Sequence, residues 1–197
     1  MMKLHEYSWR HVALLPLAAA WFLVTHPYTE PHWVLAVGAV LFVAGELLRV
    51  WATGHLRKDE VLTISGPYRY VRNPMYLGTL LIVTGLLVAG GDGMLLAVFL
   101  AVFCLYYIPR KERREGRRLL KTFGMDYAQY VVSVSSLVPR LKPYEVADAA
   151  RFSFQQVLRN NEHQTALSLL VAVAVLVLKL VWPHPWVPLP TSVLEYL

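Results

Sequence analysis

Cysteine is almost absent from this chain of 197 residues. The single cysteine, Cys104, lies within an apolar run, so no disulfide framework can form within the chain. The HExxH, HxxxH and CxxC signatures of metal sites are missing, as are GxSxG and the P-loop, so we predict no metal site. The N-terminus lacks the pattern of a cleaved secretory signal, and we therefore expect the first apolar run to be retained.

Charged residues are also scarce, at 16% of the chain against 56% hydrophobic residues. Soluble domains average about 25% charged residues, and the mean hydropathy of this chain is +0.43. The composition therefore favours an integral membrane protein, and the length favours one domain. Acidic residues are outnumbered by basic ones, with 13 Asp and Glu against 19 Lys and Arg.

Apolar residues gather in five runs along the chain. A membrane-spanning helix needs about 20 residues, with roughly 17 as a lower limit. The second run is long enough, and the others need flanking residues to reach that length. The glycine-rich joint AGGDG, residues 89–93, predicts a tight hairpin between the third and fourth runs. We expect an all-α polytopic membrane helix bundle with about five spans, formed by Val12–Val24, Trp33–Trp51, Met75–Val88, Met94–Ile108 and Ala166–Trp182.

Lysine and arginine occupy alternate loops between these runs. Residues 25–32, 89–93 and 183–197 contain neither, whereas residues 52–73 and 110–165 contain most of them. Cytoplasmic loops are the ones enriched in Lys and Arg, so both basic segments are expected in the cytoplasm, with the N-terminus on the same side. The net charge of +6 is then expected to face membrane lipids, and we predict no binding of nucleic acid.

We expect four parts within the single domain, residues 1–197. Residues 1–51 form the N-terminal helices, residues 52–143 a cofactor-binding catalytic part, residues 144–165 an interfacial amphipathic helix, and residues 166–182 the last transmembrane helix. Apolar residues from Leu119 to Val131 recur at three- and four-residue spacing, which predicts a cytoplasmic amphipathic helix over Arg110–Val131. The segment Ser135–Pro143 ends that helix.

The segment GPYRYVRNPMYLG, Gly66–Gly78, is dense in polar, aromatic and conformationally stiff residues. Its glycine–proline start predicts a turn. Pro74 suits the first turn of a helix, so Asn73 is the expected N-cap. The free N–H groups of that helix start favour an anion, with Arg72 and Tyr76 beside it. The alternative is an interfacial belt that anchors the helix among lipid headgroups.

Glu115 is predicted to face the apolar side of the helix over Arg110–Val131, with Lys111 one turn earlier. A carboxylate on a buried face is destabilising unless it is paired or binds a ligand. Two explanations remain open at this point, a structural Lys111–Glu115 ion pair and a functional carboxylate.

These two blocks resemble the isoprenylcysteine carboxyl methyltransferase family. GPYRYVRNPMYLG is similar to the family's G-x-Y-x-x-x-R-H-P-x-Y-x-G signature, which extends to the related phospholipid N-methyltransferases. The second block, EGRRLLKTFGMDYAQYVVSVSSLVPRLKP, is similar to the family's E-E-x-x-L-x-x-x-F-G-x-x-Y-x-x-Y run. The resemblance covers about Gly45–Pro143, half of the chain.

The resemblance implies a multi-pass membrane enzyme that methylates a lipophilic or lipidated substrate with S-adenosylmethionine, from an active site on the cytoplasmic side. Glu115 takes the place of the first motif glutamate, and Lys111, with Arg110 adjacent, that of a basic residue that holds the substrate carboxylate. The expected catalytic residues are therefore Arg110, Lys111 and Glu115. The expected cofactor-binding residues are Leu62, Thr63, Tyr68, Arg72, Asn73, Pro74, Tyr76 and Glu115.

The chain departs from the family pattern at two positions. Asn73 stands in place of histidine, and it can form hydrogen bonds but cannot carry charge. Gly116 stands in place of the second glutamate. The first change argues against proton transfer that depends on the family's histidine. The second puts the identity of the methyl acceptor in question.

Several functions remain open on the sequence. Methyl transfer from a sulfonium needs orientation and exclusion of water, and a carboxylate acceptor needs only a cation to position it. An amine acceptor, as in phospholipid N-methylation, needs a base, for which Glu115 is the suitable carboxylate. Sterol reductases that use NADPH resemble the same fold and segment, and an inactive membrane scaffold is the non-enzymatic alternative.

Overall fold

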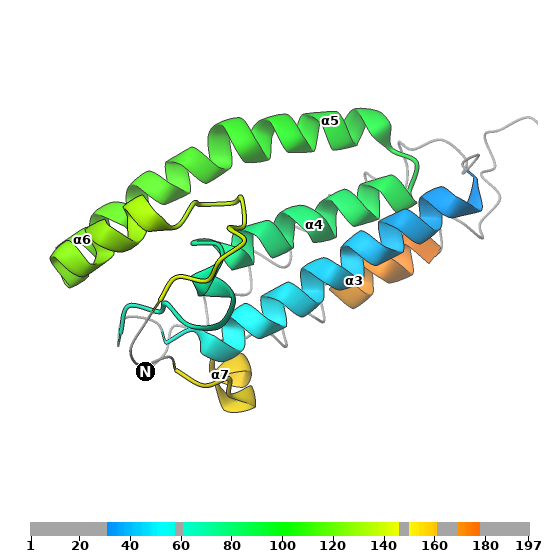
Figure 1. The fold of residues 1–197 in the computed structure, drawn as a ribbon. Helices are drawn as coiled ribbons and strands as arrows, with labels where there is room; N and C mark the ends of the chain where they lie inside the picture. The colour runs from blue at the N-terminus through cyan, green and yellow to red at the C-terminus, as the bar shows by residue number, and fades with distance from the viewer. Residues whose placement is uncertain (1–30, 58–60, 146–149, 161–168, 178–197) are drawn as a thin grey trace, which may run out of the picture.

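The computed structural model describes residues 31–57, 61–145, 150–160 and 169–177, and these residues form helices and loops without a strand (Figure 1). The all-α prediction is therefore confirmed for this part of the chain. The predicted run Val12–Val24 lies outside it, as do parts of the predicted segments 144–165 and Ala166–Trp182; residues 169–177 of the latter are helical. The elements are α3 (His32–His55), η1 (Gly66–Arg69), α4 (Pro74–Ala89), α5 (Gly93–Ala101), η2 (Val102–Tyr107), α6 (Ile108–Ser133) and α7 (Phe154–Arg159).

Helices α3 and α4 run antiparallel and pack side by side along their length (Figure 1). Glycines at seven-residue spacing allow this close approach. A Cβ atom added at Gly45 of α3 would lie 2.7 Å from the carbonyl oxygen of Gly78 in α4, and one added at Gly85 would lie 2.6 Å from the carbonyl oxygen of Gly38. Small residues at such contacts are typical of helices that pack within membranes, where backbones approach closely.

The predicted hairpin between the third and fourth runs is confirmed, since α4 ends at Ala89 and α5 begins at Gly93. The fourth run and the helix predicted from Arg110 are not separate, because helix continues from Gly93 through Pro109 into α6. Proline at position 109 lacks the N–H that bonds the preceding turn. The wider π-helical segment η2 lies directly before it and accommodates that missing bond.

Helix α6 is kinked at Gly124, whose φ of 54° and ψ of −127° are not helical. The apolar periodicity predicted one straight helix through this point, and that expectation is corrected here. Glycine adopts a positive φ without the strain that a Cβ atom would bring. After the kink the chain turns back along the first part of α6 (Figure 1). Tyr127 and Tyr130 thereby pack with Leu119 and Phe123.

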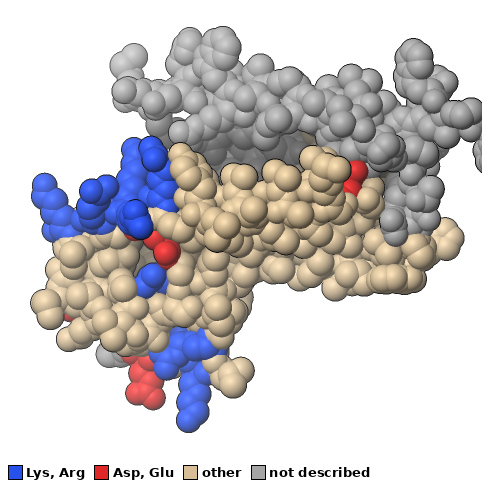
Figure 2. Space-filling model, turned by 90° about the horizontal axis from the view of Figure 1, so that it is seen from above, with Lys and Arg blue, Asp and Glu red and all other residues tan. Residues whose placement is uncertain are grey.

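Apolar and basic surfaces are separated along the molecule. Among the described residues, His32–His55 and Gly93–Ser133 are long and apolar enough to cross a membrane, and Pro74–Ala89 is apolar but shorter. Large apolar side chains point outward from these helices, among them Trp33 at 66% and Met94 at 82% exposure. Lysine and arginine gather at the end of the molecule where α6 lies (Figure 2). The arrangement of five spans remains a prediction.

Candidate active site

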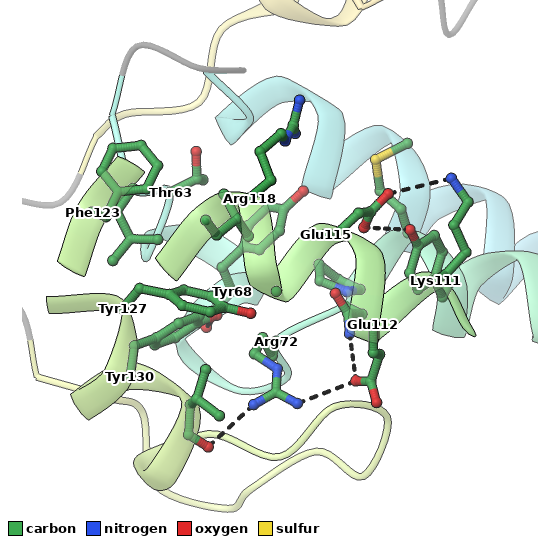
Figure 3. Close-up of a pocket in the computed structure, with 18 of the residues that line it drawn as sticks. Thr63, Tyr68, Arg72, Lys111, Glu112, Glu115, Arg118, Phe123, Tyr127 and Tyr130 are labelled. Atoms are coloured by element: carbon green, nitrogen blue, oxygen red, sulfur yellow. Dashed lines mark hydrogen bonds and ion pairs between the residues drawn. The ribbon is translucent and has the colours of Figure 1, made fainter. Parts of the chain in front are cut away.

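A cavity of about 1210 Å³ lies at the basic end of the molecule. Its walls come from the C-terminal end of α3 and the segment that follows, from η1 and the first turns of α4, and from both parts of α6 (Figure 3). The two sequence blocks that predicted a site therefore face one cavity.

Nearly all of the predicted site residues line this cavity. They are Leu62, Thr63, Tyr68, Arg72, Asn73, Pro74, Tyr76, Lys111 and Glu115. Arg110 is the exception, because it is exposed and its guanidinium lies 5.8 Å from the ring centroid of Tyr106. At about 100° per residue, Arg110 and Glu115 point to nearly opposite sides of α6. We therefore do not retain Arg110 as a catalytic residue.

The turn that opens the first block is built as predicted. Gly66 has a φ of 57° and begins the short helix η1, in which Pro67 is the second residue. The ring of His55 occupies the space beside Gly66, 2.4 Å from where a Cβ atom would stand. Nδ1 of this buried histidine lies 2.9 Å from the carbonyl oxygen of Ala150 and 3.1 Å from Oγ of Ser65. His55 thus fixes the turn against the end of α3.

Backbone hydrogen bonds join the first block to the segment that follows α6. The N–H groups of Arg72 and Asn73 donate to the carbonyls of Ser135 and Ser136, at 2.8 and 3.0 Å. In the other direction, the N–H of Arg140 donates to the carbonyl of Tyr70 at 2.9 Å. The segment predicted to end the helix therefore has a structural role, since it lies along the first block and is hydrogen-bonded to it.

Arg72 forms the centre of a polar network under the cavity (Figure 3). Its guanidinium donates to Oε1 of Glu112 at 3.1 Å and to the carbonyl of Val131 at 3.1 Å. Nδ2 of Asn73 donates to the same Glu112 oxygen and to Oγ of Ser136, both at 3.0 Å. Asn73 precedes α4 as predicted, but its side chain forms no cap. The predicted position of Asn73 before the helix is confirmed, but its side-chain amide donates hydrogen bonds to Glu112 and Ser136 instead of capping α4.

Glu112 is the functional candidate that the sequence reasoning missed. It lines the cavity three residues before Glu115, on the same side of α6. A Cβ atom at Gly116, where the family has its second glutamate, would lie 3.3 Å from the hydroxyl of Tyr127. A side chain there is therefore crowded, and Glu112 supplies a second carboxylate from the preceding turn. The three-residue spacing between Glu112 and Glu115 could have indicated that both carboxylates lie on the same side of the helix.

Glu115 has partners on two helices. Its Oε2 accepts a hydrogen bond of 2.5 Å from the hydroxyl of Tyr76, and Nζ of Lys111 donates to its Oε1 at 3.3 Å (Figure 3). The side chains of Lys111 and Glu115 are 39% and 36% exposed. The ion pair expected as the structural alternative is present, but it shares the carboxylate with a residue of the first block.

Tyrosines form the apolar wall of the cavity beneath this network. Tyr68, Tyr127 and Tyr130 are all buried, and the hydroxyl of Tyr130 donates to the carbonyl of Tyr68 at 2.8 Å. Burial raises the pKa of Tyr130, so its hydroxyl stays protonated and keeps this donor role. All three tyrosines line the cavity, where an aromatic ring can attract a cation.

The donor set fits a ligand that carries charges of both signs. Two carboxylates, Glu112 and Glu115, line the cavity together with a larger number of cations, namely Arg49, Arg57, Arg72, Lys111, Arg113, Arg117 and Arg118. No three His, Cys, Asp or Glu side chains among the described residues are grouped so that they can hold a metal ion. At about 1210 Å³ the cavity is larger than the roughly 300–1,000 Å³ that most sites for small molecules enclose.

Comparison with known proteins points to methyltransferases. Residues 33–126, just under half of the chain, match the phospholipid methyltransferase family. The cobalt-zinc-cadmium resistance protein CzcN of Cupriavidus metallidurans is 32% identical over 142 residues, which cover 69% of this chain and 64% of that protein. The chain thus spans less than two thirds of the length of this relative. No solved structure matches the chain. The family match includes both the first block and the cavity face of α6 up to Asp126.

Proposed function

We propose that the protein is an integral membrane methyltransferase that uses S-adenosylmethionine and acts on a lipophilic substrate at the cytoplasmic side. One observation carries this proposal: two sequence blocks about 40 residues apart converge on one cavity, joined by the Tyr76–Glu115 and Arg72–Glu112 hydrogen bonds. The match of residues 33–126 to the phospholipid methyltransferase family supports the same reaction class.

The cavity residues suit S-adenosylmethionine. Its ammonium group and ribose hydroxyls are matched by the carboxylate of Glu115, and its sulfonium by the aromatic faces of Tyr68 and Tyr76. Leu62 and Thr63 line the same cavity and offer backbone contacts. When bound there, the cofactor supplies an activated methyl group. The residues of the chain then orient the acceptor and exclude water from it.

We propose a carboxylate, as in an isoprenylcysteine-like group, as the methyl acceptor. Cations outnumber carboxylates around the cavity, which favours an anionic group over an ammonium. Lys111 lines the cavity beside Glu115, and its ammonium can hold a carboxylate as a point charge. Met75, Thr79 and Tyr107 extend the lining toward the apolar helices, where the hydrocarbon part of a lipophilic acceptor fits.

Phospholipid or other amine N-methylation is the second candidate, and the family match favours it. An amine acceptor loses a proton during methylation, so this reaction needs a base near the cavity. Glu115 is the carboxylate assigned that role, because it lines the cavity between Tyr76 and Lys111. A phospholipid acceptor also carries a phosphate that the lining cations would hold.

The two candidates are separated by the stability of the product. Membranes that contain the protein are incubated with S-adenosylmethionine labelled in its methyl group, and the labelled lipid fraction is treated with base. Carboxyl methylation predicts label that is released as methanol, whereas N-methylation predicts label that base does not remove. If no label enters lipid or protein above the level of membranes without the protein, the proposed reaction class is wrong.

A further inference from the structure

The outer face of α6 carries a stripe of four basic side chains that the cavity does not explain. Arg110, Arg114, Arg117 and Lys121 are spaced by four, three and four residues, and all four are exposed. At about 100° per residue they fall within roughly 60° of one another, on the side of α6 away from Glu115. We call these four residues the basic stripe. Arg117 also reaches the edge of the cavity.

The basic stripe begins where the apolar part of the long helix ends. Tyr106 and Tyr107 are exposed by 61% and 39%, and the guanidinium of Arg110 lies 5.8 Å from the ring centroid of Tyr106. Tyrosines followed by arginines mark the level of lipid headgroups on a membrane-spanning helix. Figure 2 shows lysine and arginine gathered at this end, beside a surface on which few charged residues are seen.

Distances along the helix set which cations reach the headgroups. With a rise of about 1.5 Å per residue, Arg114 lies about 6 Å beyond Arg110, and Lys121 about 16 Å beyond it. The polar layer on each side of the hydrocarbon core is about 5–7 Å thick. Screening at physiological salt acts over about 8 Å. Arg110 and Arg114 therefore lie within the headgroup layer, Arg117 lies within one screening length of its outer edge, and Lys121 lies beyond that range.

We propose that the basic stripe binds the headgroups of anionic lipids in the cytoplasmic leaflet. This inference rests on the membrane embedding in the proposed function, but it does not depend on methyl transfer. Glu115 lies on the side of the same helix away from the stripe, with Lys111 between the two, so lipid binding holds the cavity at the level where a lipophilic acceptor presents its polar end. Arg110, which does not line the cavity, has this role instead of a catalytic one.

The test compares phosphatidylglycerol with phosphatidylcholine, each added to the full chain purified in detergent. Thermal unfolding is followed with each lipid, and native mass spectrometry counts the lipid molecules retained. We expect phosphatidylglycerol to raise the melting temperature more than phosphatidylcholine, with a difference that shrinks as sodium chloride is added. Equal shifts with the two lipids, or a difference that salt does not reduce, would overturn the proposal.

Two double variants, one within the basic stripe and one outside it, test whether the stripe causes the preference for phosphatidylglycerol. The double variant Arg110→Gln, Arg114→Gln is expected to lose about half or more of the phosphatidylglycerol-specific shift and of the retained lipid. Lys142→Gln with Arg151→Gln removes the same charge from two exposed positions outside the stripe and is expected to keep both. Equal losses in the two double variants would refute a role for the stripe. Neither readout uses S-adenosylmethionine, so a failure here leaves the labelling result for the proposed reaction unaffected, and the reverse also holds.

Discussion

The hydroxyl of Tyr76 donates a hydrogen bond of 2.5 Å to the carboxylate of Glu115, across 39 residues of sequence. This bond links the first turn of α4 to the cavity face of α6, and with it the two blocks from which the sequence predicted a site. Lys111 shares the same carboxylate from one turn earlier. Glu115 therefore does more than pair with Lys111 on its own helix, so substitutions of Glu115 can distinguish a structural role from a functional one.

We predict that Glu115→Gln abolishes methyl transfer while changing stability little. The substitution keeps the shape of the side chain and its ability to accept from Tyr76, but it removes the charge. Because both partners of the Lys111 pair are more than a third exposed, the pair is expected to contribute no more than about 1 kcal/mol to the free energy of unfolding. Methyl transfer from labelled S-adenosylmethionine and thermal unfolding in detergent measure the two effects.

The double variant with Lys111→Met separates the two roles of Glu115. If Glu115 only neutralises Lys111, removing both charges should restore the stability that Glu115→Gln loses. Because Lys111 is itself proposed to hold the acceptor, thermal unfolding is the measurement that separates the two roles. We expect the double variant to remain inactive whatever its melting temperature. Full activity in Glu115→Gln alone would show that the carboxylate has no part in the reaction.

Substitution of Glu112 is predicted to destabilise the fold, in contrast to that of Glu115. Arg72 and Asn73 both donate to Glu112, whose side chain is 28% exposed, and that of Arg72 is 17% exposed. In Glu112→Gln the guanidinium loses a charged acceptor in a half-buried site, which is expected to cost about 1–3 kcal/mol. The measurement is thermal unfolding in detergent, with the exposed Glu145→Gln as a control for the lost charge. Equal melting temperatures in the two variants would contradict the network described above.

The helix boundaries that could be predicted are those that glycine and proline mark. The run over Met75–Val88 became α4, Pro74–Ala89, because Pro74 begins the helix and a glycine-rich joint follows it. The sequence reasoning ended the fourth run at Ile108, whereas helix continues through Pro109 into α6. The π-helical widening of η2 that accommodates this proline depends on backbone geometry that residue types alone do not specify.

The candidate site was largely predictable because its residues fall in two dense blocks, but their partners were not. Tyr76 and Glu115 were each singled out, while their hydrogen bond depends on how α4 and α6 pack. Glu112 was missed because its partners lie about 40 residues earlier in the chain. The kink at Gly124 was missed because the apolar spacing continues through it.

Close packing of α3 on α4 predicts that Gly85→Ala is destabilising. The added Cβ atom would lie 2.6 Å from the carbonyl oxygen of Gly38 and 2.6 Å from the backbone nitrogen of Phe42, so the helices must move apart. Overpacking of this kind is expected to cost about 1–3 kcal/mol. Gly93→Ala is the matched control, because nothing lies within 4 Å of its added Cβ atom. Thermal unfolding should separate the two variants, and equal melting temperatures would contradict this packing.

The distribution of basic residues predicts that Asp92 and Lys142 lie on opposite sides of the membrane. Single cysteines at these positions, in a Cys104→Ser background, are labelled with a membrane-impermeant maleimide in right-side-out and inside-out vesicles. We expect Lys142→Cys to react from the cytoplasmic side and Asp92→Cys from the other side. Reaction of both from the same side would refute the topology and place α4 and α5 outside the bilayer.

The central claim, that this cavity binds S-adenosylmethionine, is tested most directly by calorimetric titration of the purified protein with the cofactor. The account predicts one saturable site, with affinity reduced about tenfold or more in Tyr76→Ala, a loss of about 1.4 kcal/mol or more. Arg110→Gln, which changes a residue outside the cavity, should bind as the unaltered chain does. Absence of binding, or equal affinity in the unaltered chain and in Tyr76→Ala, would contradict the account.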